Sequence, residues 1–312
     1  MRKILHSVYL KIAVTLLLLY YLSRQIDFNL LQISLQSVNY FYLPLLVFVI
    51  ICFWIVNVMS LYFLLLPIGE MRFATFFKYQ LKSIVLGSVT PMELGEATIF
   101  IFFKKNDFPL QQALSAFLLN KVIHVILMFL TGFIFLYYIQ YANTTYLLLT
   151  VVLMVATAIA VVQSPLRILI REIIVKKYFD RYYNFFELVS DYVRKHAAYL
   201  LLNIAVNLVK VIVAGVIIWL NFRLFNININ VFLLASIYNM TRILSLIPVS
   251  ISGLGIQEGG VALALSKFGF NYSIIVTAMF FLRLLAISMA LVFLLYTFLK
   301  RTILDNDSKT AR

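Results

Sequence analysis

The chain has 312 residues, of which 63% are hydrophobic and 12% charged, and its mean hydropathy is +0.99. A soluble domain of this length could not cover so much apolar surface with so few charges, which excludes soluble enzymes and soluble binding modules. The net charge of +14 does not indicate a nucleic-acid partner, because the basic residues cluster beside apolar stretches, where anionic lipid headgroups are the expected partner. We therefore expect an all-α polytopic membrane protein.

Six full membrane spans are predicted from apolar stretches of about 20 residues, the length that crosses a hydrocarbon core about 30 Å thick. They are placed at 4–22, 42–66, 113–138, 145–163, 198–222 and 272–299. The first stretch has no small-residue cleavage site, so we interpret it as an uncleaved span and not as a signal peptide. Between the fourth and fifth spans, residues 164–197 contain a mixture of basic and aromatic residues, which predicts a cytoplasmic interfacial linker helix.

Two further apolar stretches, 72–103 and 231–266, are interrupted in the middle by proline, glycine and glutamate. The interruptions are marked by Pro91, Gly95, Pro248, Gly253 and Gly255. Irregular backbone persists at membrane depth only where protein or a water-filled cavity satisfies its polar groups. Each stretch is therefore predicted to be a re-entrant helical hairpin.

The distribution of basic residues predicts the topology. Most of them lie before the first span, beside the first broken stretch, in the linker and after the last span. All of these positions fall on the cytoplasmic side only if each broken stretch returns to the side from which it entered. The first hairpin then opens to the cytoplasm and the second to the outside, in a multi-pass protein of the cell membrane whose termini are both cytoplasmic.

An internal repeat emerges when the chain is compared with itself at a shift of 162 residues (258 − 96). Glu96 then falls on Glu258 and Lys121 falls on Arg283, so that each acid is followed 25 residues later by a base (121 − 96 and 283 − 258). Two similar halves of opposite orientation are the plan of many transporters, whose sites lie near the midplane where broken helices meet. We expect a single transmembrane domain, 1–312, with repeat one at about 42–138 and repeat two at about 198–299.

Ionisable residues inside a membrane cost at least about 2.5 kcal/mol each, so each needs a partner or a function. The candidate substrate-binding residues are Glu93, Glu96, Lys121, Asn207, Lys210, Arg242, Glu258 and Arg283. One interpretation is that Glu96 pairs with Lys121, and Glu258 with Arg283, only to fix the hairpins. The other is that the four bases, which outnumber the three acids, compensate the charge of a phosphate-bearing headgroup.

Other kinds of chemistry find little support in the sequence. His124 follows Lys121 by three positions, and we interpret it as a packed histidine and not as a proton relay. No residues have metal-ligand spacing, and neither an ATP-binding glycine-rich loop nor a nucleophile triad is present, so no metal, cofactor or catalytic residue is predicted. The functions left open are a lipid flippase or scramblase, a membrane-embedded enzyme, an accessory protein that presents lipid to a separate soluble enzyme, and a small-anion secondary transporter.

Two segments resemble the signatures of a known family. Pro91-Met-Glu-Leu-Gly95-Glu96 and Pro248-Val-Ser-Ile-Ser-Gly253-Leu-Gly255-Ile-Gln-Glu258 are similar to those of the lysylphosphatidylglycerol synthase transmembrane-region family. That family is also described as flippase-like and includes the N-terminal membrane half of the multiple peptide resistance factor. The resemblance covers nearly the whole chain, and it implies binding phospholipids or polyprenyl lipids or moving them between leaflets.

The chain departs from the family pattern at two places. Ala97-Thr98-Ile99 follow the first Gly-Glu, where the family often has a base, and Ser252 and Gln257 replace a glycine and an arginine of the second motif. The resemblance therefore does not predict a headgroup. The aminoacyl-transferring members have a large soluble C-terminal domain, and this chain ends at Arg312, so synthase activity is not expected.

Overall fold

The computed structural model of the chain describes residues 38–89, 91–138, 191–192 and 194–245, residues 253–310, and the single residues 20, 32 and 36. Within these residues the structure is helical and contains no strand. The helices are α3 (Tyr42–Leu65), α4 (Phe73–Val89), the 3-10 helix η1 (Pro91–Thr98), α5 (Ile99–Lys105), α6 (Leu110–Tyr138), α10 (Ala197–Leu224), α11 (Val231–Ser245), α12 (Ile256–Ser266) and α13 (Tyr272–Thr310). The predicted span 4–22 except residue 20, the whole of the span 145–163 and most of the linker 164–197 lie outside the described residues.

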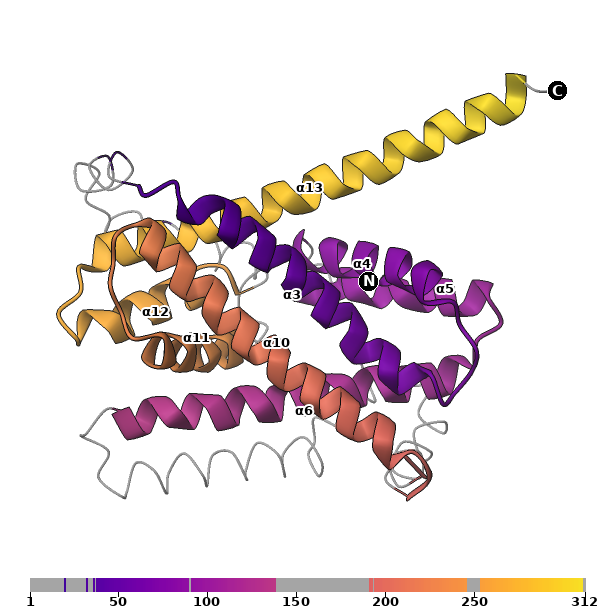
Figure 1. Cartoon of the computed structure of the whole chain (residues 1–312), viewed down its shortest axis with the longest axis horizontal. Helices are drawn as coiled ribbons and strands as arrows, with labels where there is room; N and C mark the ends of the chain where they lie inside the picture. Colours follow the sequence, from indigo (N-terminus) through magenta and orange to yellow (C-terminus); the bar gives the residue numbers. More distant parts are fainter. Residues whose placement is uncertain are drawn as a thin grey trace, which may run out of the picture.

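Four of the described helices, α3, α6, α10 and α13, are long and apolar enough to cross a membrane. They coincide with four of the predicted spans, and only α13 differs by more than a few residues. Its apolar part ends at Thr297, but the helix continues to Thr310 and extends beyond the rest of the bundle (Figure 1). Residues 298–310 contain neither proline nor glycine, so nothing in the sequence stops the helix where its apolar part ends.

Large apolar side chains are exposed on the outer faces of these long helices. Examples are Phe48 of α3, Leu201 and Ile212 of α10, and Leu284 and Val292 of α13. Exposed apolar surface of this extent is unusual in a soluble monomer, whereas lipid tails are as apolar as leucine and accept it. The polar side chains that the structure buries lie instead between the helices.

Helices α3 and α10 run antiparallel along their whole lengths. At one end the Asn39 N–H donates to the Leu224 carbonyl at 2.8 Å, so the residues just before α3 lie beside the end of α10. At the other end Asn203 Nδ2 donates to the Ser60 carbonyl at 2.5 Å, which joins the start of α10 to the last turns of α3. Figure 1 shows the two helices lying against each other.

The same order of elements occurs twice in the described chain: a long helix, two shorter helices and a second long helix. The first set is α3, α4, α5 and α6, and the second is α10, α11, α12 and α13. The sets interlock, because α11 packs against α6 and α4 packs against α13. An apolar cluster lies in each set, the first around Phe76 and Phe103 and the second around Phe222 and Leu265.

The chain turns back on itself at η1, so that α5 lies antiparallel to α4. The ring of Phe76 stacks on Phe103 with the centroids 6.5 Å apart, and Tyr79 stacks on Phe102 at 4.5 Å. In the second set, α12 packs against α11, and the Cα position of Gly260 faces Thr241. The chain that joins α11 to α12, including Pro248, lies outside the described residues.

Gly95 allows the turn at η1 to lie directly against α4. A Cβ atom at this position would lie 2.2 Å from the carbonyl carbon of Leu86 and 2.4 Å from the amide nitrogen of Gly87. Both are backbone atoms of a helix and cannot move aside. Only glycine permits this approach, which explains why the broken stretch contains a glycine here.

We expect Gly95→Ala to lower the free energy of unfolding by about 1–3 kcal/mol or more, because the new methyl group overlaps the α4 backbone. Thermal unfolding of the purified protein in detergent measures the loss. The matched control is Gly132→Ala, whose added Cβ would meet the flexible Met240 side chain at 2.5 Å. A loss in the control as large as that in Gly95→Ala would contradict the close approach at η1.

Candidate functional site

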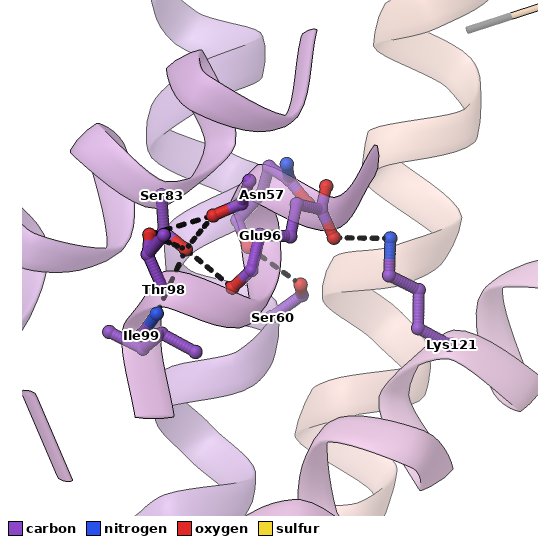
Figure 2. A network of polar contacts seen from close by, with 8 residues as sticks. Asn57, Ser60, Ser83, Glu96, Thr98, Ile99 and Lys121 are labelled. Carbon is purple, nitrogen blue, oxygen red and sulfur yellow. Dashed lines mark hydrogen bonds and ion pairs between the residues drawn. The ribbon is translucent and has the colours of Figure 1, made fainter. Parts of the chain in front are cut away.

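The first ion pair joins the turn at η1 to the long helix that follows it. Glu96 Oε2 lies 2.5 Å from Lys121 Nζ of α6, and Figure 2 shows the lysine reaching toward the turn. The exposed fractions of the two side chains are 14% for Glu96 and 36% for Lys121. The protein therefore encloses this pair only in part, and its lysine also lies 5.7 Å from the centre of the Phe117 ring.

Ser83 of α4 holds the backbone that positions Glu96 (Figure 2). Its hydroxyl donates to the Glu96 carbonyl at 2.5 Å and accepts from the Ile99 N–H at 3.1 Å. Thr98 Oγ1 donates to the Gly95 carbonyl at 2.7 Å. A helix that ends inside a protein leaves backbone groups without intrahelical partners, and these hydroxyls supply them.

The second ion pair is drier and has more contacts. Glu258 lies in the first turn of α12. Its Oε1 accepts a hydrogen bond from Arg283 Nε of α13 at 2.5 Å. Its other oxygen, Oε2, accepts from the Gly255 N–H at 2.8 Å, and Arg283 Nη2 donates to Gln257 Oε1 at 3.2 Å. Only 1% of the Glu258 side chain and 17% of the Arg283 side chain are exposed.

The backbone before α12 explains how Glu258 reaches both partners. Gly255 has φ +84° and Gly253 has φ +72°, in the left-handed region that favours glycine. This geometry turns the Gly255 N–H toward the carboxylate three residues later. A carboxylate in the first turn is also favoured by the positive end of the helix dipole.

The structure thus contains both ion pairs that the sequence register suggested, each between a break and the following long helix. Of the other candidates at the breaks, Glu93 and Pro91 lie in the first half of η1, and the structure describes only the backbone of these two residues. The role of the paired residues in binding a substrate stays a prediction.

A third group of polar residues lies where α6, α10 and α11 meet. We refer to it as the interior polar cluster, formed by Asn120, His124, Thr131, Asn203, Asn207, Lys210, Asn239 and Arg242. Asn120 Oδ1 accepts from the side-chain amides of Asn203 and Asn207, both at 2.9 Å, and Asn239 Nδ2 donates to Thr131 Oγ1 at 3.0 Å. Three of the predicted candidates, Asn207, Lys210 and Arg242, therefore belong to one cluster.

Sequence reasoning did not single out Asn120 or the role of Ser83. Asn120 precedes Lys121 in a helix whose polar face is narrow, and only the neighbouring α10 shows what it binds. A signal for Ser83 was present, because it falls on Ser245 at the same shift of 162 residues that aligns the two glutamates.

Comparison with known proteins gives one match. A family model described as the lysylphosphatidylglycerol synthase TM region matches residues 8–295, which includes both breaks, both ion pairs and the interior polar cluster. No curated protein and no solved structure matches the chain.

The two ion pairs should differ in their contribution to stability. We expect Arg283→Met to lower the free energy of unfolding by about 3–5 kcal/mol, because it leaves the buried Glu258 carboxylate without its base. Lys121→Met should cost less than Arg283→Met, because the Glu96 carboxylate that it leaves without a base is less buried than that of Glu258. Thermal or denaturant-induced unfolding in detergent measures both.

Adding Glu258→Gln to Arg283→Met removes the buried negative charge and should recover part of the loss. Lys104→Met, which neutralises an exposed lysine of α5, is the control and should leave stability unchanged. Equal losses for Lys121→Met and Arg283→Met would show that burial does not distinguish the pairs.

Proposed function

Because the chain belongs to the lysylphosphatidylglycerol synthase transmembrane-region family, a family of multi-pass membrane proteins, we propose that it binds anionic phospholipid or polyprenyl-lipid headgroups and moves them between leaflets. The observation that most supports this proposal is the charge inside the helix bundle. Glu96 and Glu258 each bind a base at their own break, while Lys210 and Arg242 add two positive charges to the interior polar cluster.

A headgroup phosphate suits this arrangement of charges. Lys210 is only 5% exposed, so its positive charge lies inside the bundle, where the attraction between opposite charges is stronger than in water. A lipid headgroup that passes between the helices would bring its phosphate close to that charge while its acyl chains stay in the bilayer. Movement in this form needs no nucleotide and runs down the lipid gradient.

The different exposure of the two ion pairs supports a stepwise passage. The Lys121–Glu96 pair is partly exposed at the surface of the bundle, so a headgroup phosphate could reach the lysine without separating the helices. The Arg283–Glu258 pair is nearly dry and costs more to open. The first break is then the side at which a headgroup enters more readily.

We also propose that the two sets of helices are inverted repeats whose hairpins re-enter the membrane from opposite sides. The antiparallel packing of α3 and α10, which are the first helices of the two sets, supports this arrangement. The first hairpin opens to the cytoplasm and the second to the outside, in the cell membrane, with both termini cytoplasmic, as the basic residues predict.

Accessibility of single cysteines tests the topology. In a Cys52→Ser background, Lys104→Cys places a thiol at the end of α5 and Lys267→Cys places one at the end of α12, and both positions are exposed. We expect a membrane-impermeant maleimide applied to intact cells to label position 267 and not position 104. Labelling of both positions from the same side would contradict the inverted arrangement.

Lipid movement is tested with the full chain in vesicles that carry a fluorescent phosphatidylglycerol in one leaflet. We expect the protein to accelerate transfer between leaflets over protein-free vesicles, and Arg242→Met to slow that transfer about tenfold, the effect of losing one charge-assisted contact.

Lys104→Met removes the same charge from an exposed position and should leave the rate unchanged. Vesicles with an unrelated polytopic protein control for non-specific leakage of lipid. No acceleration with anionic phospholipid or with a polyprenyl phosphate would count against the proposed function.

A further inference from the structure

His124 of α6 is buried, and neither of its ring nitrogens has a hydrogen-bond partner among the described residues. Its exposed fraction is 6%. A neutral imidazole has one N–H donor and one acceptor nitrogen, and leaving both unsatisfied in a buried position is destabilising. The interpretation of His124 as a packed histidine does not account for these two nitrogens.

Three cationic side chains, Lys210 of α10, Arg242 of α11 and Lys121 of α6, act electrostatically on this imidazole. Lys210 follows Asn207, which bonds Asn120 one turn before His124, and Arg242 follows Asn239, which bonds Thr131 two turns after it. The three cations come from three different helices, so their charges converge on one region of the interior. Lys121 also bonds Glu96, which connects this region to the first break.

The surrounding hydrogen bonds fix the three helices around His124. Asn120, one turn before it on α6, holds Asn203 and Asn207 of α10. Thr131, two turns after it, accepts from Asn239 of α11. Because α6 is tied to α10 on one side of His124 and to α11 on the other, the imidazole and the cations are held in place before any ligand arrives.

We propose that His124, Lys210 and Arg242 form an oxyanion site that takes a tetrahedral phosphate group. A phosphate has several oxygens, so the guanidinium fork, the ammonium group and an imidazole N–H can each bind a different one. The phosphate would come from a lipid headgroup or from free phosphate. This inference rests on the proposed function and deepens it, because it assigns the phosphate of the headgroup to a defined place in the bundle.

The binding of inorganic phosphate and the binding of phosphatidylglycerol are both measured on the purified full chain in detergent. Inorganic phosphate is titrated while the thermal unfolding midpoint is followed, with sulfate-free chloride buffer of equal ionic strength as the reference. Native mass spectrometry then compares the retention of phosphatidylglycerol with that of a neutral diacyl glycolipid of the same chain length.

We expect the unaltered chain to bind at least one of the phosphate-bearing probes and to retain the neutral glycolipid less well. His124→Leu and Lys210→Met should each weaken that binding about tenfold or more, because each removes one contact to the anion. Lys210→Arg keeps the charge and should retain binding. Lys104→Met changes the net charge equally at an exposed position and should bind as the unaltered chain does.

Binding of phosphatidylglycerol without competition from inorganic phosphate would support the site with a lipid as its source. Binding of inorganic phosphate alone would support it with free phosphate as the source. Failure of both probes to bind the unaltered chain would overturn the inference, as would binding that Lys104→Met weakens as much as Lys210→Met does. If His124→Leu does not fold, His124→Phe replaces it, and if Lys210→Met does not fold, Lys210→Gln replaces it. Equal binding by the folded His124 variant and the unaltered chain would overturn the role of the imidazole.

The two proposals fail separately. Phosphate binding that depends on His124 and Lys210, in a protein that does not accelerate lipid transfer, would contradict the proposed function and leave the oxyanion site standing. Suppose instead that the protein accelerates lipid transfer, but substitutions at His124 and Lys210 leave its binding of phosphate and lipid unchanged. That result would overturn the oxyanion site and leave the proposed function standing.

Discussion

Inside a membrane, a backbone group or a charge that leaves its helix must find its partner within the protein, and this requirement shapes both breaks in the chain. At the first break Ser83 bonds two backbone groups of the turn, and Gly95 lets the turn lie against α4. At the second, the carboxylate of Glu258 accepts the Gly255 N–H and then binds Arg283. Each solution places a glutamate at the turn and a base on the next long helix.

The two ion pairs at the breaks differ in their burial and in their additional contacts. The first pair is partly exposed and is supported by hydroxyl groups, whereas the second is more buried and has an additional amide contact from Gln257. Because burial makes an ion pair costly to open, the second pair should cost more free energy to separate than the first. Lys121, Lys210 and Arg242, from three helices, act electrostatically on His124 in the interior polar cluster, which is where we propose that a phosphate binds.

The sequence predicted those features of the site that depend on residues close together in the chain, and it missed those that depend on contacts between distant helices. Apolar length located α3, α6, α10 and the start of α13, and the proline and glycine residues located the break at η1. The pairing of Glu96 with Lys121 was readable because scarce charges recur at one spacing. The hydrogen bond from Asn203 to Asn120 could not be predicted from the sequence, and neither could the lack of hydrogen-bond partners for the ring nitrogens of His124. Both depend on how helices that are distant in sequence are rotated against one another, which no local pattern specifies.

The sequence by itself determined the class of protein, the four long helices that the structure describes and the register of the two ion pairs. These depend on composition, on the length of apolar segments and on the positions of charges that are costly in hydrocarbon, all of which follow from the linear sequence. Only the tertiary structure decided which pair is dry, that Ser83 supports the first turn, and that Lys210 and Arg242 lie near His124. Burial and convergence are properties of packed helices, so they exist only once α6, α10 and α11 are placed together.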